Sequence, residues 1–244
     1  METTDIHSKS STFTFENVRK FSKKTDEYFD IDHLVSREPY SQFKKWLDDV
    51  ENQQIDEARI FTLATTTKSG IPSCRPLRLA SIIDGEGFTF FTNYDSRKGK
   101  ELEENPYAAM SFWWPSTARA IRIEGQVTKL SSAKSDDYFY SLPREMQVGT
   151  VVNVQCKRII QNRQQLLDLK NKYSGQSQLQ RPDRWGGYLL VPHTLEFFQR
   201  QHDWVSDRIR FRRLLKNDNV SSLVIDGSTT HQGDDDWVFE RLAP

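Results

Sequence analysis

The sequence predicts a mainly β fold with peripheral helices, built as a barrel or a sandwich. Three observations carry this prediction. Short segments in which apolar and polar side chains alternate recur from residue 59 to the C-terminus. Turn-forming residues separate them, as in the stretch 84–87. Only a few stretches space their apolar residues as a helix does. The clearest alternation lies within 118–130, where Ile121, Ile123, Gly125 and Val127 face one way and Arg122, Glu124 and Gln126 the other.

Composition limits the classes of function. The chain has 244 residues, enough for one large or two small domains. The formal net charge of zero argues against bulk electrostatic binding of nucleic acid. No apolar run approaches the ~20 residues that a membrane helix needs, and the N-terminus lacks an apolar signal region. We therefore expect a cytoplasmic protein that binds neither nucleic acid nor membrane.

Cysteine and histidine usage excludes several kinds of site. Cys74 and Cys156 make no disulfide framework and fit a reducing compartment. The five histidines have no metal-ligand spacing, so we expect no metal site. The sequence also contains no P-loop, no strand-linked G-x-G-x-x-G and no G-x-S-x-G elbow.

The first half of the chain is predicted to be strands with two helices. Apolar positions at helical spacing predict a helix over 39–51, with Pro39 in its first turn. A second helix is predicted over 96–104, because good helix formers follow N-cap residue types there. The predicted strands cover 59–66, 73–83, 88–93, 107–114 and 118–130.

The second half contains two predicted helices and then returns to strands. One helix covers 132–141, with Ser131 or Ser132 as its N-cap, and the other covers 157–173. The predicted strands are 185–191, 194–199, 207–212 and 237–242, with a loop over 217–235. The stretch 174–183 is the best candidate for a linker, but no domain boundary is clear.

The chain changes from strand to helix at residues 93–98, and this junction outlines an anion site. Arg97 and Lys98 lie where the predicted helix begins. Free backbone N–H groups and the positive end of the helix dipole point the same way, and phosphate is their usual ligand. The alternative is a solvated cationic helix start, and this stretch alone does not decide between the two.

The run at 208–213 alternates arginine with apolar residues. One face of this strand carries Arg208, Arg210 and Arg212. The simpler interpretation, which we prefer on this evidence, is a solvated edge strand that its charges protect from pairing. The alternative is that one arginine lines a ligand pocket.

Taken together, these pieces resemble the pyridoxamine/pyridoxine 5′-phosphate oxidase family over roughly residues 38–244. The matching segments are RPLRL at 75–79, FFTNYDSRKGKEL at 90–102, RIEG at 122–125, WGGY at 185–188, DRIRFRR at 207–213, DW at 236–237 and ERLAP at 240–244. The resemblance implies an FMN-binding split β-barrel of six strands in Greek-key order. It also implies a homodimer with FMN in a cleft between the subunits. The implied organisation is a largely flexible N-terminal arm over 1–37 and one domain over 38–244, with a C-terminal dimerisation region over 184–244.

The resemblance also assigns flavin contacts position by position. They are Arg75, Pro76, Leu77, Arg78, Phe91, Thr92, Arg97, Lys98, Gln155, Cys156, Phe198 and Arg208. The implied phosphate ligands Arg97 and Lys98 coincide with the anion site outlined above. Three positions depart from the family pattern, because glutamine, serine and tryptophan are replaced by Ala120, Cys156 and Phe198. Most of the implied flavin site is therefore kept.

The implied substrate positions depart much more. The family holds the substrate phosphate with a lysine, a tyrosine, an arginine and a serine. The residues at these positions are Ala80, Tyr138, Leu142 and Met146, and the Arg-x-His pair that covers the substrate ring is Trp204, Val205 and Ser206. The clamp thus lacks both side-chain cations, and charge-assisted hydrogen bonds are worth about 1.5–3 kcal/mol each. Tyr138 and Arg208 remain as the implied catalytic residues.

Three functions stay open at this point. The first is an FMN-dependent oxidase that converts pyridoxine or pyridoxamine phosphate to pyridoxal phosphate with oxygen. The second is a paralogue that keeps FMN but acts on a different, less anionic small molecule. The third is a non-catalytic flavin-binding protein or partner subunit.

Overall fold

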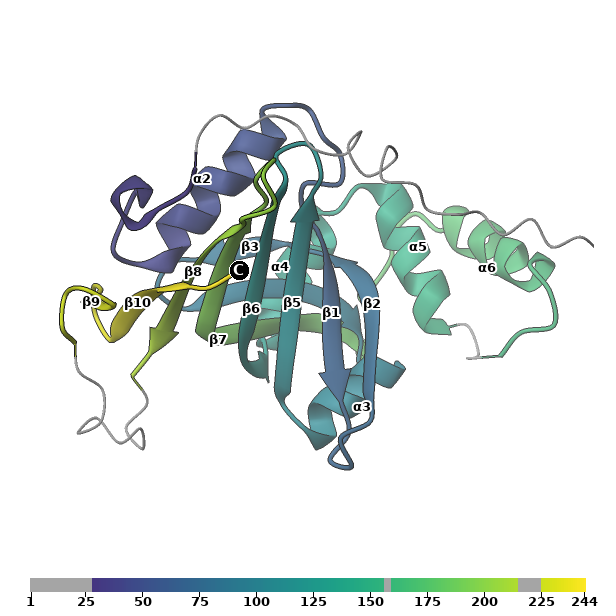
Figure 1. The fold of residues 1–244 in the computed structure, drawn as a ribbon. Coiled ribbons are helices and arrows are strands. Elements are labelled where there is room, and N and C mark those ends of the chain that lie inside the picture. The colour runs from purple at the N-terminus through teal and green to yellow at the C-terminus, as the bar shows by residue number, and fades with distance from the viewer. Residues whose placement is uncertain (1–27, 156–158, 215–224) are drawn as a thin grey trace, which may run out of the picture.

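The computed structural model describes residues 28–155, 159–214 and 225–244. Most of the implied N-terminal arm, and Cys156, therefore lie outside the described residues. The described chain forms one antiparallel sheet of ten strands with helices at its periphery (Figure 1). The prediction of a mainly β fold with peripheral helices is confirmed.

The sheet is organised around one long strand. The strands are β1 Ile60–Thr66, β2 Pro72–Arg78, β3 Ser81–Ile83, β4 Gly87–Asn93, β5 Tyr107–Trp114, β6 Arg119–Lys129, β7 Trp185–Gln199, β8 Asp207–Arg213, β9 Thr230–Gln232 and β10 Trp237–Leu242. Their order is β2-β1-β5-β6-β7-β8-β10-β9, and β4 pairs with β3 and β7. The first half of β7 pairs with β4 and its second half with β8. Elements that flank β4 and elements that flank β8 are thus held at opposite ends of β7.

The helices lie outside the sheet. They are the 3-10 turn η1 Ile31–His33 and the α-helices α2 Pro39–Glu51, α3 Arg97–Glu104, α4 Ser132–Ser141, α5 Arg144–Gln155 and α6 Gln164–Ser174. The helix predicted over 39–51 is present, and the Glu38 side chain accepts hydrogen bonds from the first turn of α2. Figure 1 places α5 and α6 together at the edge of the molecule, beyond β1 and β2.

The main core is largely aromatic. Phe43 of α2 packs edge-on against Phe88 of β4 and Phe112 of β5, with ring centroids 4.9 and 5.2 Å apart. All three rings are fully buried. Burying each such side chain contributes about 1.5–3 kcal/mol, so α2 is fixed to the sheet by hydrophobic contact.

A second, smaller core joins α4, α5 and α6 to the start of β7. Its buried members are Phe139, Val148, Val151, Val152, Leu179 and Trp185. The three valines recur at helical spacing on α5. This cluster therefore stabilises a helix whose own sequence, with several β-branched residues and a glycine, has low helix propensity.

Several predicted elements differ from the structure. The strand predicted over 73–83 is two strands, β2 and β3, because the chain turns at residues 79–80 to pair with β4 instead of β1. No element is predicted over 142–156, where the structure has α5. The first two residues of the helix predicted over 157–173 lie outside the described residues, and from residue 159 on the helix begins only at Gln164, where the apolar face that packs on α5 begins. A short strand, β9, lies inside the loop predicted over 217–235, because it pairs with β10.

The strands predicted over 185–191 and 194–199 are one continuous strand. The pairing of β6 with β7 shifts between Glu124 and Gly125, opposite Pro192 and Thr194. A proline breaks a regular ladder but is accommodated at such a bulge. The apparent interruption in the sequence is therefore an irregularity within β7, not its end.

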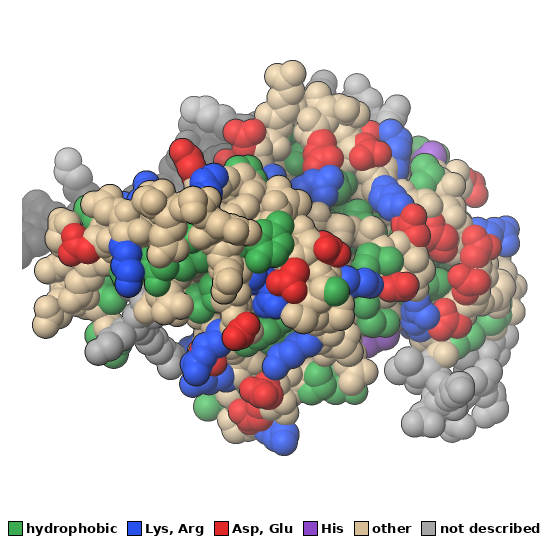
Figure 2. Space-filling model, turned by 180° about the vertical axis from the view of Figure 1, so that it is seen from behind, with side chains coloured by type: hydrophobic (Ala, Val, Ile, Leu, Met, Phe, Trp, Pro, Cys, Tyr) green, Lys and Arg blue, Asp and Glu red, His purple; other side chains and the backbone are tan. Residues whose placement is uncertain are grey.

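The surface carries charges of both signs. In Figure 2, acidic and basic side chains are interspersed over the face seen from behind. This fits the formal net charge of zero. Within the part of the chain that the structure describes, no helix is long and apolar enough to cross a membrane.

Candidate functional site

The junction between β4 and α3 has the form that the sequence indicates. The Ser96 side chain caps α3, with its Oγ accepting a hydrogen bond from the Gly99 N–H at 3.3 Å. The next two residues are the cations of the predicted anion site: Arg97 is exposed and Lys98 is half-buried. Their backbone N–H groups belong to the first turn of α3, which leaves them without partners inside the helix.

Gly99 lets α3 approach the preceding turn closely. A Cβ atom at this position would lie 2.1 Å from the carbonyl oxygen of Tyr94. Any larger residue would push α3 away from the end of β4. The glycine thus sets the distance between the cations of α3 and the strand that precedes them.

Glu101 organises the positive groups around this junction. Its side chain is buried, and it accepts hydrogen bonds from the hydroxyls of Thr65 and Ser73 at 2.5 and 2.6 Å. It also pairs with Arg97 of its own helix at 2.7 Å and with Arg75 of β2 at 3.3 Å. Burial alone would raise the pKa of Glu101. These hydrogen bonds and charges outweigh it and lower the pKa to about 2.

Lys98 completes this cluster, and it forms no ion pair within the described part of the chain. Its Nζ lies 3.2 Å from the Thr92 hydroxyl and 3.4 Å from the Ser96 hydroxyl. Burial, and then the positive charge of Arg75, lower the pKa of Lys98 below its ordinary value. Three cations thus share one carboxylate, Glu101, which leaves an excess of two positive charges. Such a cluster can hold a dianion.

The remaining part of β2 alternates between the core and the surface. Arg75 and Leu77 are partly buried, whereas Pro76 and Arg78 are exposed. Ala80 follows at the turn into β3, where its N–H donates to the Thr89 carbonyl at 2.9 Å. Within the described residues, the Arg78 side chain has no hydrogen-bond or ion-pair partner, unlike Arg75.

Tyr138 of α4 lies flat on Phe91 of β4. The two ring centroids are 3.8 Å apart and the rings are nearly parallel, and Trp185 stacks beside them. The approach of Phe91 to β7 requires Gly187, where a Cβ would lie 2.7 Å from the Phe91 ring. Burial raises the pKa of Tyr138, while the nearby charges of Arg78 and Arg59 act in the opposite direction. The hydroxyl therefore stays protonated across the physiological range.

A cavity of about 350 Å³ lies between α4 and the strands β3 and β4. Tyr138 and Phe91 contribute to it, together with Ser81, Ile83, Thr89, Leu130, Lys134, Asp137 and Ser141. It is the described cavity that contains the tyrosine of the implied substrate site. Its size suits a small heteroaromatic molecule.

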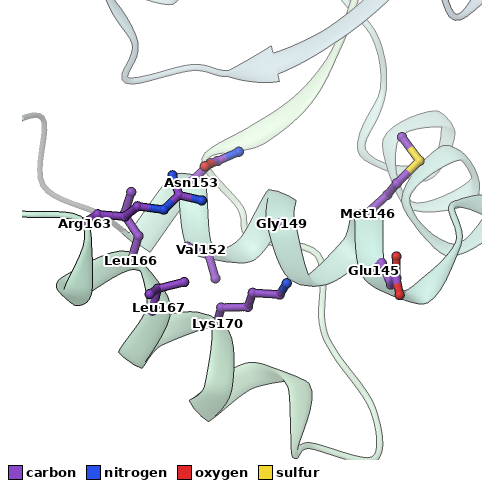
Figure 3. A pocket seen from close by; sticks show the side chains of 9 residues that line it. All are labelled: Glu145, Met146, Gly149, Val152, Asn153, Arg163, Leu166, Leu167 and Lys170. Carbon is purple, nitrogen blue, oxygen red and sulfur yellow. The ribbon is translucent and has the colours of Figure 1, made fainter.

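Leu142 and Met146 do not line this cavity. Leu142 is partly buried and packs against the second core. Met146 is about half exposed and faces a groove of about 370 Å³ between α5 and α6. Figure 3 shows this groove, with Val152 and Leu167 on facing helices and Lys170 extending along it. These two positions thus differ in their surroundings, because Leu142 packs against the second core and Met146 lies on the surface.

The other implied flavin and substrate residues gather at the far end of β7. Ala120 of β6 and Arg208 of β8 are both paired with Phe198. Arg208 is oriented by Glu196, at 2.8 and 3.0 Å, and by the Ala243 carbonyl at 3.0 Å. The prediction of a solvated edge strand is wrong, because β8 pairs with both β7 and β10.

The loop before Arg208 exposes apolar side chains. Trp204 and Val205 are 56% and 60% exposed. Trp204 also has a φ of 69°, in a region that bulky residues rarely adopt. Ser206 follows them, directly before β8. An exposed tryptophan held in an unfavourable backbone conformation is a candidate contact for a ligand or a second subunit.

Within one chain, these two groups of residues do not come together. Phe91 pairs with Gly187 near the start of β7, and Arg208 pairs with Phe198 near its end. Eleven residues of strand separate the two positions, a length of about 36 Å. Gln155 lies elsewhere again, at the end of α5, in a polar groove of about 550 Å³ with Tyr173 and Arg181. Tyr138 and Arg208 of the same chain are therefore not part of one contiguous site.

Sequence reasoning did not identify Glu101, Thr65 or Ser73. A glutamate in a short cationic helix looks like a solvated surface residue. The available signal was its spacing of four residues from Arg97, which predicts an ion pair on one face of the helix. Its burial depends on β1 and β2, which no local pattern reveals. In residues 28–155, 159–214 and 225–244, no three or more His, Cys, Asp or Glu side chains are grouped so that they could hold a metal ion.

Comparison with known proteins gives matches along nearly the whole chain. Residues 47–170 match a family model described as pyridoxamine 5′-phosphate oxidase. Residues 185–244 match one described as the pyridoxine 5′-phosphate oxidase C-terminal dimerisation region. The pyridoxine-5′-phosphate oxidase of Bos taurus is 41% identical over 233 residues, covering 93% of this chain and 86% of its own. The pyridoxine/pyridoxamine 5′-phosphate oxidase of Bombyx mori is 40% identical over 228 residues, covering 91% and 86%.

A solved structure extends the likeness to three dimensions. PhzG from Burkholderia lata 383, in complex with tetrahydrophenazine-1-carboxylic acid, superposes with a TM-score of 0.75 at 26% identity. The match covers 91% of this chain and all of PhzG. An FMN-binding protein of Nostoc punctiforme related to pyridoxamine 5′-phosphate oxidase has the same fold, with a TM-score of 0.64 at 16% identity. The chain belongs to the pyridoxamine 5′-phosphate oxidase family.

Proposed function

We propose that this chain is an FMN-dependent oxidase of pyridoxine or pyridoxamine 5′-phosphate that works in vitamin B6 salvage. Oxygen is the electron acceptor and is released as hydrogen peroxide. Pyridoxine 5′-phosphate gives pyridoxal 5′-phosphate directly, and pyridoxamine 5′-phosphate gives it with uptake of water and release of ammonia. The observation that carries the proposal is the cluster of Arg75, Arg97 and Lys98 around Glu101 at the start of α3. Family membership and the curated relatives of about 40% identity support the same activity.

The residues at the β4–α3 junction fit the phosphate of FMN. A phosphomonoester carries nearly two negative charges at neutral pH, which matches the excess positive charge of the cluster. The partly buried Lys98 gains most from such a partner, because an anion would offset both its desolvation and the repulsion from Arg75. Free N–H groups of the first turn of α3 would contribute further hydrogen bonds.

The arrangement of β7 supports a site shared by two subunits. One flavin is far too short to span the ~36 Å of strand between Phe91 and Phe198. If all the implied contacts serve one cofactor, Phe198 and Arg208 must come from the partner of the chain that supplies Lys98. We propose a homodimer with FMN at the interface of two six-stranded Greek-key barrels. The match to a dimerisation region over 185–244 supports this assembly.

The protein residues have defined tasks in this proposal. Arg97 and Lys98 hold the FMN phosphate, and Arg75 and Thr92 lie beside them. Tyr138 contacts the substrate as a neutral hydrogen-bond donor. Arg208 is held by Glu196 in one orientation, so it can face the substrate as a fixed positive charge. The chemistry that FMN supplies when bound is two-electron acceptance from the substrate carbon and reoxidation by oxygen.

Two measurements test the proposal. The purified protein should be yellow with a band near ~450 nm, or become so on addition of FMN. It should then consume oxygen with pyridoxine 5′-phosphate or pyridoxamine 5′-phosphate and release hydrogen peroxide. A colourless protein that takes up no FMN refutes the cofactor assignment. A yellow protein that turns over neither compound at millimolar concentration refutes the substrate assignment alone.

The second candidate is an FMN paralogue with a less anionic substrate. It is favoured by Ala80, Leu142 and Met146, because neither cation of the family clamp is present at its usual position. The ligand named for PhzG, a phenazine carboxylic acid, has no phosphate, so the fold accepts such compounds in a relative. Oxygen uptake with unphosphorylated pyridoxine, matched against its phosphate, separates the two candidates. A non-catalytic partner subunit would bind FMN and turn over neither.

A further inference from the structure

We infer that Arg78 supplies the positive charge that holds an anionic group of the substrate beside Tyr138. The inference rests on the proposed function, because it identifies a specificity residue for the same site. It assigns to the Arg78 side chain a different ligand from the flavin contact that the family resemblance implies.

The backbone of β2 directs Arg78 outward. Side chains alternate along the strand, with Leu77 partly buried against the main core and Arg78 on the opposite, exposed face. Leu79 donates its N–H to the Arg59 carbonyl at 2.8 Å, which fixes the end of β2 at this position. The guanidinium of Arg78 is therefore presented outside the barrel, where the chain turns into β3.

Tyr138 lies on the same outer face. Its ring covers Phe91 at 3.8 Å, and the adjoining cavity is formed by β3, β4 and α4. The two charges that act on its hydroxyl are those of Arg78 and Arg59. Ser81, three residues after Arg78, lines this cavity, so the chain brings Arg78 to its edge, where its charge reaches the phenol.

Arg78 differs from Arg59 in its ion pairing, and this difference decides which arginine can bind a substrate anion. Arg59 is already paired with Glu51, with its Nε 2.5 Å from Oε1. Arg78 has no carboxylate or hydrogen-bond partner in the described part of the chain. Lys134 lines the cavity and has no ion-pair partner among the described residues, but Asp137 of the same helix lines it too, so these two side chains add no net charge. Of the two guanidinium groups whose charges reach Tyr138, the one without a partner in the described part of the chain is therefore Arg78.

The position of Ala80 fits this assignment. Ala80 lies two residues after Arg78 and directly before Ser81, which lines the cavity. An arginine can bind a phosphate or carboxylate through two parallel hydrogen bonds. Arg78 would then supply the positive charge that the family's lysine supplies at position 80, two residues further along the chain.

The experiment is equilibrium binding of pyridoxal 5′-phosphate and of unphosphorylated pyridoxal to the FMN-loaded protein, which needs no turnover. Arg78→Leu should weaken binding of the phosphate compound about tenfold to a hundredfold and leave pyridoxal unchanged. Arg78→Lys should lose less. Lys68→Ala removes one positive charge from the turn at the other end of the β1–β2 hairpin and should change neither affinity.

A rescue variant makes the test independent of misfolding. Arg78→Leu combined with Ala80→Lys should regain most of the lost affinity, because a cation returns to the same mouth of the cavity. The inference is overturned if Arg78→Leu binds pyridoxal 5′-phosphate as the unaltered protein does, or if it loses FMN affinity to the same degree. An unaltered protein that binds FMN but neither pyridoxal compound would overturn the proposed substrate as well.

Discussion

The regions around Glu101 and around Tyr138 arrange their polar groups in opposite ways. Around Glu101, two hydroxyls and two arginines converge on one buried carboxylate. Around Tyr138, stacked aromatic rings merge into the apolar core formed by α4 and α5. The first region has a network whose members hold one another in place. The second has few fixed polar partners, so its specificity depends on single side chains.

This difference is consistent with the unequal departure from the family pattern that the resemblance implies for the two regions. A substitution in the Glu101 network would leave several buried polar groups without partners, which is costly. A substitution such as leucine at 142 can join the neighbouring hydrophobic cluster at little cost. Substitutions in the Glu101 network should therefore have larger effects than substitutions around Tyr138.

Removing the carboxylate at the centre of the network should have the largest effect. Glu101→Gln should lower the free energy of unfolding by about 3 kcal/mol at pH 7, because buried cations lose their counter-charge. The lowered pKa of Glu101 predicts a pH window. Its stabilisation is complete above pH ~4.5 and is lost as the pH falls toward 2. Urea unfolding at pH 7 and pH 3 should therefore show a smaller loss at pH 3.

Glu103→Gln is the matched control for this comparison. Glu103 lies on the same helix but is largely exposed, and its pair with Lys129 is at 4.0 Å. It should change stability by no more than about 0.5 kcal/mol. An equal effect of both variants would mean that Glu101 is not the centre of a network.

Truncating the lysine of the cluster should affect the cofactor more than the fold. Lys98→Ala should weaken FMN binding about tenfold to a hundredfold, because one charge-assisted hydrogen bond is lost. Fluorescence titration of the apoprotein with FMN measures this. Lys100→Ala, two residues along α3 and exposed, should have no such effect. Equal FMN affinity of the two variants would place the phosphate elsewhere.

Restoring a charge in the apolar region should cost stability. Leu142→Arg puts a guanidinium against the second core, and it should lower the free energy of unfolding by about 1–2 kcal/mol. Met146→Ser, at a half-exposed position, should stay within about 0.5 kcal/mol. Thermal or urea unfolding of the two variants measures the contrast. A stabilised Leu142→Arg protein would show that this position faces an anion and not the core.

Removing only the hydroxyl of Tyr138 should have the smallest effect. Tyr138→Phe keeps the stack on Phe91, so the melting temperature should hardly change. The affinity for pyridoxal 5′-phosphate should fall about threefold to tenfold, as for one neutral hydrogen bond. Because burial raises the pKa of Tyr138, the unaltered protein should show no loss of binding from this group up to pH ~10. A loss that is absent in Tyr138→Phe and begins near pH 8 would contradict this.

Much of the site could be anticipated from local sequence. The helix cap at Ser96, the cations at 97 and 98 and the strand before them follow from residue types that act within a few positions of one another. The family motifs lie in these same segments. Local sequence patterns did not predict α5, where the burial of valines in the second core outweighs their low helix propensity. They also did not predict that β7 is one strand, because Pro192 lies at a bulge within it.

The sequence by itself determined the order of strands and helices along most of the chain and the capped helix start with two cations after β4. Only the tertiary structure decided that Glu101 is the shared partner of Arg75 and Arg97, because residues from β1, β2 and α3 must first be packed together. It also decided that Lys98 and Arg208 of one chain lie at opposite ends of β7. Pairing between distant strands sets that separation, and no short-range preference of the chain encodes it.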